Sequence, residues 1–397
     1  MLSKKSINDL TASFLQGKRV LVRVDFNVPM KDGTITDDAR IRASLPTIKD
    51  LQSKGAKIIL ATHLGRPDGQ VVESLRVAPI AKRLSELLGE SVAVASDCIG
   101  SEVQEQTHQL KAGQILLLEN VRFHKEETDN APEFSKALAS LADLFVQDAF
   151  GTVHRAHSST EGVAHFIPAY AGYLIEKELN FLDGAIANPK RALVAIIGGS
   201  KVSSKMGVLT HLLDKVDTLI IGGGMTFTFL CAKGLEIGKS LCEKDRIEEA
   251  SAFLKKAEHS RTKVVFPADQ VVVSTFDGNA PTQTVPIDQI PADKLGVDVG
   301  PATVKEIAEI VKTAQTILWN GPLGVFEVPA FSHGTFGVAQ LLADSNAITI
   351  IGGGDSAAAI AQAGLIDKMT HISTGGGASL EFLEGKTLPG IAILENK

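Results

Sequence analysis

Polar residues rich in arginine and histidine follow four apolar runs in the first part of the chain. The runs cover residues 20–24, 57–61, 115–118 and 144–146, and their Val, Ile and Leu content is typical of buried strands. Arginine presents a planar fork that matches carboxylate and phosphate oxygens. Because the carboxyl ends of parallel strands meet at one edge of a sheet, we expect these side chains to converge on a small ligand with several anionic groups.

The candidate residues at this edge come from four places in the sequence. They are Asp25, Phe26 and Asn27, with Arg40 opening the next predicted helix, then His63, Leu64, Gly65 and Arg66, then Arg122, and finally Arg155. Any single charge could be a solvated surface group, because most charged side chains are exposed. Convergence from four strand ends favours an anion site instead. His154 and His157 also favour anion contact, since two histidines without other ligands nearby are a weak metal signal.

Glycine-rich turns follow the apolar runs of the second part, which include residues 193–197, 218–221, 316–319 and 347–351. Glycine lets backbone N–H groups approach a phosphate closely, and a helix that begins at such a turn adds a favourable dipole. One such turn could simply be tight, but five of them favour a nucleotide site. The turns are Gly198 and Gly199, Gly222 and Gly223, residues 320–324, Gly353 and Gly354, and residues 375–377.

Charged residues stand beside two of these turns. Lys201 and Lys205 follow the first turn, where they could neutralise a phosphoryl group during its transfer. Asp355 follows Gly353 and Gly354, and a hard carboxylate at that place could hold Mg²⁺ beside nucleotide phosphates. The sequence therefore favours a phosphoryl-transfer enzyme.

Two other interpretations stay open from the residues alone. Gly352, Gly354 and Ala357 fit the loose dinucleotide fingerprint, so an NAD-dependent dehydrogenase is one alternative. Against it, the candidate strand near residues 371–374 ends without the acid that would hold a ribose. A non-catalytic two-lobe anion-binding protein is the other alternative, and it would not need two lysines beside Asp355. Residues 234–240 are one residue short of a phosphate-binding loop and follow no strand, so we interpret them as a coincidence.

Strands and amphipathic helices alternate twice along the 397 residues. This order predicts an α/β protein with two Rossmann-like lobes, each a parallel sheet flanked by helices, and a cleft between the lobes. We expect an N-terminal domain over residues 1–172, a connecting helix and hinge over 173–190, and a second domain over 191–380. The first 172 residues contain 9 of the 12 Arg but only 11 of the 36 Gly, so the two domains should bind different ligands.

Composition excludes several classes of partner. A net charge of −6 argues against binding nucleic acid or a membrane surface. No apolar run approaches the ~20 residues of a membrane span, and the N-terminus lacks the apolar core of a signal peptide. Three cysteines with no CxxC spacing fit a reducing compartment. We expect a cytoplasmic protein, and we expect it to be a monomer.

Taken together, the motifs resemble those of the phosphoglycerate kinase family over nearly the whole chain, in order and in spacing. The substrate-side segments are RVDFNVP (23–29), HLGRP (63–67), RFH (122–124) and GTVHRAH (151–157). The nucleotide-side segments are GGSKVSSK (198–205), WNGPLGVFE (319–327), GGDS (353–356) and GGGASLE (375–381). The departures from the family pattern are Ser204, where many members carry an acidic residue, and Ser356, where Thr is common.

The resemblance implies a role for each matching position. The substrate 3-phosphoglycerate would be held by Asp25, Phe26, Asn27, Arg40, His63, Leu64, Gly65, Arg66, Arg122 and Arg155. The nucleotide, ATP or ADP, would be held by Gly198, Gly199, Lys205, Gly222, Gly223, Gly296, Val325, Glu327, Gly353, Gly354, Asp355 and Ser356, with Asp355 on Mg²⁺. The C-terminal tail, residues 381–397, would pack back on the first domain.

The reaction implied is the reversible transfer of a phosphoryl group from 1,3-bisphosphoglycerate to ADP, giving 3-phosphoglycerate and ATP. The nucleophile is already an oxyanion, so no general base is needed. We expect catalysis by positioning and charge stabilisation, with Arg40, Lys205, Lys201 and the backbone of Gly354 acting on the transferring group. The two ligands are expected on different domains, so the domains would close to bring them together.

Overall fold

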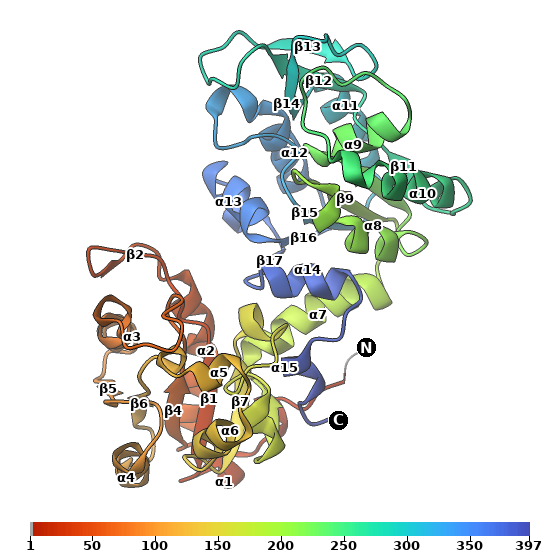
Figure 1. The fold of residues 1–397 in the computed structure, drawn as a ribbon. Coiled ribbons are helices and arrows are strands. Elements are labelled where there is room, and N and C mark those ends of the chain that lie inside the picture. The colour runs from red at the N-terminus through yellow and green to blue at the C-terminus, as the bar shows by residue number, and fades with distance from the viewer. Residues whose placement is uncertain (1–2) are drawn as a thin grey trace. The chain divides into compact units, whose positions relative to one another are not determined.

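The structure is a computed structural model that describes residues 3–397, and the chain forms two compact units (Figure 1). Unit 1 extends to Asn180 and includes Thr387–Lys397, whereas unit 2 is Phe181–Lys386. The chain passes from unit 1 to unit 2 inside helix α7 (Tyr173–Ala187). The sequence predicted a connecting helix and hinge over residues 173–190, a range that includes this helix.

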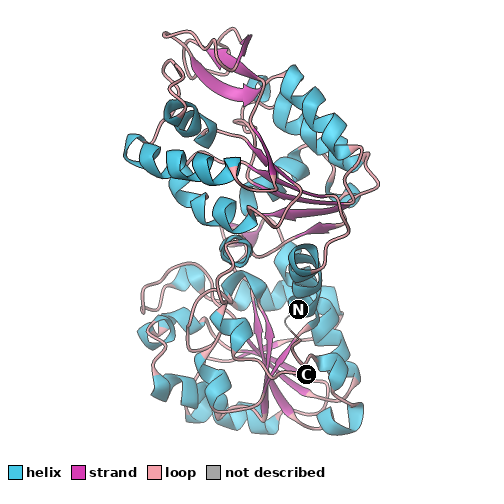
Figure 2. Ribbon diagram, turned by 90° about the vertical axis from the view of Figure 1, so that its right-hand side faces the viewer, coloured by secondary structure: helices cyan, strands magenta, loops and turns pink. Residues whose placement is uncertain are grey.

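Unit 1 is built on a six-stranded sheet in the order β5-β6-β4-β1-β7-β8, and all of its neighbouring strands are parallel. Strand β1 is buried almost throughout, because helices flank both faces of the sheet (Figure 2). The strands are β1 (Arg19–Val24), β4 (Lys57–Ala61), β5 (Ala93–Val94), β6 (Ile115–Leu117), β7 (Leu144–Asp148) and β8 (Ala169–Ala171).

The helices of unit 1 alternate with these strands. They are α1 (Ala12–Leu15), α2 (Ala39–Ser53), α3 (Ala78–Leu88), α4 (Ser101–Gln109), α5 (Lys125–Thr128), α6 (Pro132–Ala139) and the first part of α7. A short hairpin of β2 (Met30–Lys31) and β3 (Thr34–Ile35) precedes α2. Helix α3 has Pro79 in its first turn and ends at Gly89, whose φ of 75° gives the left-handed cap that glycine favours.

The C-terminal segment completes unit 1 from the far end of the sequence. Its helix α15 (Pro389–Ala392) packs near the end of β7, where the Gly390 N–H donates to Val153 O at 2.9 Å. The Lys4 ammonium donates to the carbonyls of Ala392 and Leu394, and the Lys5 N–H donates to Glu395 O. These contacts join the two ends of the described chain within one unit.

Unit 2 contains a second six-stranded parallel sheet, in the order β11-β10-β9-β15-β16-β17, and a separate three-stranded antiparallel sheet, β13-β12-β14. The parallel strands are β9 (Leu193–Ile197), β10 (Thr218–Ile221), β11 (Lys263–Val265), β15 (Thr316–Asn320), β16 (Ile348–Gly352) and β17 (His371–Ile372). The antiparallel strands are β12 (Asp269–Val273), β13 (Gln283–Pro286) and β14 (Leu295–Val299).

Helices also surround the sheets of unit 2. They are α8 (Met206–Leu212), α9 (Met225–Ala232), α10 (Ile247–Glu258), α11 (Pro301–Val311), α12 (His333–Ala343), α13 (Gly354–Gln362) and α14 (Gly377–Leu383). Trp319 is the largest fully buried side chain, and it lies in the core that β9, β15 and β16 form with α11 and α12. In residues 3–397 no helix combines the length and the apolar character that crossing a bilayer requires.

The predicted fold class is confirmed, since each unit is a parallel sheet with helices on its faces. In unit 2 the order of strands along the sheet is that of a dinucleotide-binding fold, with the direction of winding reversed between β9 and β15. In unit 1 the reversal falls between β1 and β7. Ligands bind outside such reversal points, so the residues that follow these four strands are the first to consider.

Candidate functional site

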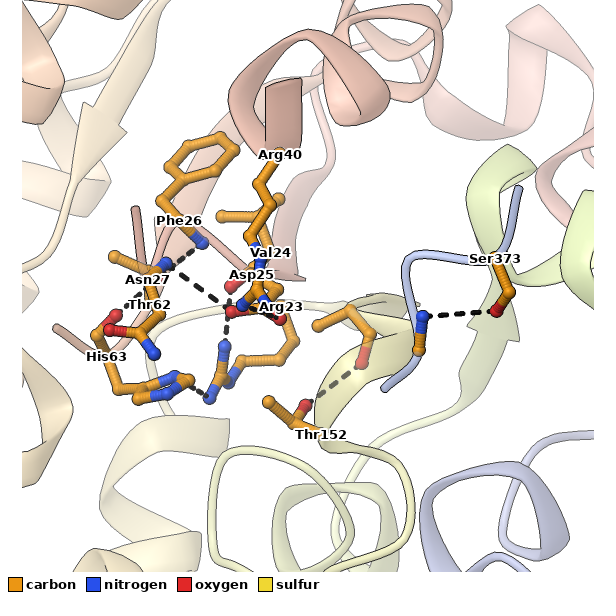
Figure 3. A network of polar contacts seen from close by, with 12 residues as sticks. Arg23, Val24, Asp25, Phe26, Asn27, Arg40, Thr62, His63, Thr152 and Ser373 are labelled. Carbon is orange, nitrogen blue, oxygen red and sulfur yellow. Dashed lines mark hydrogen bonds and ion pairs between the residues drawn. The ribbon is translucent and has the colours of Figure 1, made fainter. Parts of the chain in front are cut away.

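In unit 1 the end of β1 carries a buried arginine that organises its neighbours (Figure 3). Arg23 is only 1% exposed, although it sits in a run of Val and Leu. Its Nε donates to Ser159 Oγ at 2.8 Å, and its Nη2 lies 3.1 Å from His63 Nδ1. Burying a guanidinium is costly unless its N–H groups are paired, and these contacts pair them. Arg23 therefore links the ends of β1 and β4.

Backbone groups fix the loops on either side of Arg23 (Figure 3). The Gly65 N–H donates to Asn27 Oδ1 at 2.9 Å, and the Phe26 N–H donates to Thr62 Oγ1 at 3.0 Å. The Leu64 N–H donates to Asn120 Oδ1 at 3.2 Å. The side chains of Phe26 and Leu64 are buried in the core. These two predicted site residues therefore present no side chain at the surface.

Arg40 opens helix α2 and pairs with the carboxylate that follows β1. Its Nη1 lies 2.8 Å from Asp25 Oδ2, and the Arg40 side chain is 40% exposed while Asp25 is 8% exposed. One oxygen of Asp25 thus orients Arg40, and the remaining guanidinium N–H groups are accessible. The structure brings Arg40 to the end of β1, as the sequence predicted.

A cavity of about 270 Å³ lies beside this network within unit 1. Three predicted arginines line it: Arg66, Arg122 and Arg155. The other lining residues are Asp68, Gly69, Thr128 and His157. Arg122 donates from Nη1 to Gly65 O at 3.0 Å, while its buried Nε has no hydrogen-bond partner among the described residues. A buried, unpaired charged donor beside a cavity is costly, and an anionic ligand would satisfy it.

The pKa values of this region record an excess of positive charge. Burial is the main reason that the pKa of His63 falls well below its ordinary value, and Arg23, Arg122, Arg40 and Arg155 lower it further. Burial followed by Arg122 and other cations lowers the pKa of His157 to about 4. Burial followed by Arg23 and Arg155 lowers the pKa of Arg122 to about 10. Both histidines are therefore neutral at pH 7, and the arginines repel one another in the absence of an anion.

Unit 2 contains a larger cavity, of about 480 Å³. Six predicted nucleotide-site residues line it: Gly199, Gly223, Gly296, Val325, Glu327 and Asp355. The lining does not include the other predicted residues, which are Gly198, Gly222, Gly353, Gly354, Ser356, Lys201 and Lys205. Most of the wall is apolar, with Phe227, Leu241, Phe276 and Leu323 among the side chains. This cavity combines glycine backbone, two carboxylates and apolar surface.

Several glycines of unit 2 are required by packing of the chain itself. A Cβ at Gly198 would lie 2.2 Å from Pro322 O, and a Cβ at Gly222 would lie 2.4 Å from Leu323 Cδ2. A Cβ at Gly354 would meet nothing within 4 Å. The sequence predicted that all of these glycines face phosphate, and a side chain would find open space at Gly354 but not at Gly198 or Gly222.

Lys205 and Asn320 form a polar pair beside the turn that opens α13. The Lys205 ammonium donates to Asn320 Oδ1, and a Cβ at Gly199 would lie 3.3 Å from Lys205 Cε. Burial lowers the pKa of Lys205, while Asp355 and Glu384 act in the opposite direction. The buried Asn320 Nδ2 has no partner among the described residues and lies next to the Gly353 backbone. The Lys201 side chain is exposed, and its charge helps to lower the pKa of Glu243.

The two remaining predicted contacts differ in what they present. The Ser356 side chain is fully buried, and its Oγ accepts the Gly321 N–H at 2.6 Å, so it holds the turn after β15. The Asp355 carboxylate is exposed in the first turn of α13 and lines the cavity. A single exposed carboxylate suits Mg²⁺ when phosphate oxygens supply other ligands. The only group of three potential metal ligands in residues 3–397, Asp97, Cys98 and His124, lies in unit 1.

Sequence reasoning assigned no role to several residues of the two sites. Arg23 was quoted in a motif without a role, although its charge inside an apolar strand was a usable signal. Lys239 lines the cavity of unit 2, and Ser240 Oγ accepts the Gly296 N–H at 2.9 Å. Both belong to the 234–240 segment that was dismissed as a coincidence. The aromatic wall residues Phe227 and Phe276 carried no local signal.

Comparisons with known proteins agree on one family. The sequence model of the family described as phosphoglycerate kinase matches residues 7–386. A phosphoglycerate kinase of Gloeothece citriformis is 58% identical over 399 residues, covering 99% of this chain and 100% of the relative. A phosphoglycerate kinase of Dictyoglomus turgidum is 55% identical over 397 residues, covering 100% of both chains.

Solved structures give the same result. The structure of phosphoglycerate kinase from Coxiella burnetii matches with a TM-score of 0.91 and 44% identity, covering 98% of each chain. The crystal structure of phosphoglycerate kinase from Pyrococcus horikoshii matches with a TM-score of 0.84 and 34% identity, again covering 98% of each chain. The likeness therefore includes both units.

Proposed function

The chain belongs to the phosphoglycerate kinase family, and from this premise we propose that unit 1 binds the phosphoglycerate and unit 2 binds the nucleotide. The chain is a kinase of glycolysis that transfers a phosphoryl group between 1,3-bisphosphoglycerate and ADP. One observation carries the assignment of ligands to units. The cavity of unit 1 is lined by three arginines and one aspartate, whereas the cavity of unit 2 is mostly apolar.

The acid suits unit 1 because it is small and carries both a carboxylate and a phosphate. Arg66, Arg122 and Arg155 would pair with these groups, with Asp25, Asn27 and His63 holding the surrounding loops. A neutral His63 can donate one hydrogen bond without adding to the repulsion among the arginines. The unpaired Arg122 Nε supports an anion at this position.

The nucleotide suits unit 2 because it joins an apolar base to a polyphosphate. Gly296 and Val325 would contact the base, and Glu327 would accept hydrogen bonds from the ribose. The backbone of Gly353 and Gly354, where α13 begins, would bind phosphate together with Lys205. Asp355 would hold Mg²⁺, which when bound neutralises phosphate charge during transfer.

The transfer step needs positioning and charge stabilisation and no general base, because the attacking group is an oxyanion in either direction. Arg40 from unit 1 and Lys205 from unit 2 would both contact the transferring phosphoryl group, with Lys201 and the Gly354 N–H assisting. Neither unit alone contains this set, so we propose that the units close on their ligands before an in-line transfer.

The alternative functions are not supported. The four relatives and structures named above are all phosphoglycerate kinases, and none is an NAD-dependent dehydrogenase or a non-catalytic anion-binding protein. We also propose that the protein is cytoplasmic and monomeric. Three free thiols support a reducing compartment.

Calorimetry on the purified chain tests the assignment of ligands. Wild type should bind 3-phosphoglycerate without nucleotide and MgADP without acid, and a coupled assay with 3-phosphoglycerate and MgATP should show turnover. Arg122→Ala should weaken only the acid, and Glu327→Ala should weaken only the nucleotide. Equal losses of both ligands in either variant would contradict the division, whereas turnover without magnesium would contradict the role assigned to Asp355.

A further inference from the structure

Two cysteines of unit 2 lie in contact with each other. Cys231 is in the last turn of α9, and Cys242 is in the loop that follows it. The Cys242 thiol lies 3.4 Å from Cys231 Sγ and donates to it. Both residues are half-buried, so a small oxidant can reach them, whereas Cys98 is 0% exposed. The spacing of eleven residues gave no sign of this contact.

A disulfide between these residues requires only a small movement. The S–S bond is about 2.05 Å long, so the sulfur atoms must approach by about 1.4 Å. Rotation of the two side chains with a slight shift of the loop can supply this movement, because Cys242 is in a loop and not in a helix or strand. A thiol already in contact with an oxidised partner sulfur attacks that sulfur far faster than a separated thiol would.

The same loop forms a wall of the nucleotide cavity. Lys239 and Leu241 line the cavity, and Ser240 Oγ accepts the Gly296 N–H. On the other side of Cys242, the Glu243 N–H donates to Thr228 Oγ1 on α9 at 3.1 Å. The loop therefore contacts both α9 and the cavity, and a bond that draws Cys242 toward α9 would pull on Leu241, its neighbour in the chain.

We propose that Cys231 and Cys242 are a redox-active pair whose disulfide reshapes the nucleotide cavity and weakens nucleotide binding. With hydrogen peroxide as the oxidant, one thiolate attacks a peroxide oxygen, the O–O bond breaks, and a sulfenic acid and water form. The second thiol then attacks the sulfenic sulfur, the S–S bond forms, and a second water leaves. Two sulfur atoms lose two electrons in total, and one peroxide is reduced to two waters.

Mass spectrometry of the oxidised full chain tests the disulfide without reference to any ligand. Peroxide treatment followed by digestion should give a peptide pair joined through Cys231 and Cys242, with a loss of two hydrogens that a thiol reductant restores. The Cys98→Ser variant, which removes the buried cysteine, should form the same cross-link. In Cys231→Ser, dimedone should label Cys242. Oxidation of both cysteines to sulfinic acids without any cross-link would overturn the proposal.

Calorimetry with ADP tests the consequence, which rests on the nucleotide site proposed for unit 2. The oxidised chain should bind ADP at least about threefold more weakly than the reduced chain and 3-phosphoglycerate equally well, because reshaping a fitted cavity loses affinity. Cys242→Ser should show no such change on peroxide treatment. A cross-linked chain with unchanged ADP affinity would overturn the coupling. Failure of the reduced wild type to bind ADP would instead contradict the proposed nucleotide site and leave the mass result standing.

Discussion

The two units share a sheet architecture but prepare their cavities by opposite means. Unit 1 brings arginine side chains from several strand ends to one place, and burial together with these arginines lowers the pKa of His63 and His157. Unit 2 surrounds its cavity with glycine backbone and apolar side chains. Its half-buried lysine, Lys205, lies near two carboxylates that partly compensate its charge, Asp355 and Glu384. Similar sheets therefore carry different chemistry in the residues that follow their strands.

We expect this difference to reflect what each proposed ligand offers. A small acid with a carboxylate and a phosphate has little apolar surface to bury, so its affinity would come from charge-assisted hydrogen bonds. A nucleotide brings a large planar base, whose burial contributes affinity without charge. Unit 1 keeps its arginines close together at an electrostatic cost that a bound anion would remove, whereas unit 2 carries little net charge at its wall.

The largest effect is expected from Arg40→Ala, because we assign Arg40 a role in the transition state. Loss of a charge-stabilising donor typically lowers kcat by about 10²-fold or more. Steady-state kinetics in both directions would measure it. The matched control is Arg42→Ala, two residues further along α2, where the guanidinium pairs with Asp38. A rise in KM for the acid with kcat unchanged would reduce Arg40 to a binding residue.

Arg66→Ala should affect the acid alone. A hydrogen bond to a charged group contributes about 1.5–3 kcal/mol, so 3-phosphoglycerate should bind about 10- to 100-fold more weakly. The affinity for MgADP should stay within about twofold of wild type. Calorimetry with each ligand measures both values, and Arg83→Ala, whose guanidinium is engaged with Asp38 and Glu86, provides the control. A comparable loss of nucleotide affinity would remove the distinction between the units.

Gly354→Ala tests the backbone phosphate site in unit 2. A Cβ at this position meets nothing within 4 Å, so the fold should tolerate it, and thermal unfolding should show no loss of stability. Nucleotide affinity should nevertheless fall about tenfold if phosphate contacts this backbone, because the methyl group would occupy that space. Gly184→Ala, in α7 and also in open space, is the control. Full nucleotide affinity in Gly354→Ala would mean that phosphate lies elsewhere.

The smallest effect concerns a buried carboxyl in each unit. Burial raises the pKa of Asp148 in unit 1 to about 8 and that of Asp298 in unit 2 to about 7. Between pH 4 and these values each carboxyl is protonated in the folded state and ionised in the unfolded state. The free energy of unfolding therefore falls as pH rises through this range. Asp148→Asn should therefore raise Tm by about 2–4 °C at pH 8 and by less at pH 5.

Asp298→Asn provides the contrast. Asp298 accepts hydrogen bonds at both oxygens, including the Gly334 N–H at 2.6 Å, so an amide would place a donor against a donor and lower Tm. Asp148 accepts the Leu174 N–H at one oxygen. The hydroxyl groups of Ser44 and Thr47 lie near the carboxyl, and they can accept a hydrogen bond from the side-chain amide in Asp148→Asn. A lower Tm for Asp148→Asn than for wild type at pH 8 would contradict the expected direction of the change.

Much of the candidate site could be predicted from the sequence because its signals are local. Apolar runs identified the long strands of the two parallel sheets, but not β12 and β14 of the antiparallel sheet. The residues just after the predicted strands include Asp25, Arg66 and Asp355. A parallel sheet places such residues at one edge without any further information. The motifs were also sufficient to identify the family, which the comparisons confirm.

The tertiary structure decided what depends on contacts between distant segments. Arg23 acts through Ser159 and His63, far along the chain, and no periodicity encodes that network. The apolar wall around Phe227 and the contact between Cys231 and Cys242 arise in the same way. Burial, which sets the pKa of His63 and Asp148, is likewise a property of the folded chain. The sequence by itself determined the fold class and the chemical types at each strand end, because strand and turn signals are local; charge balance and cavity walls required the packed structure.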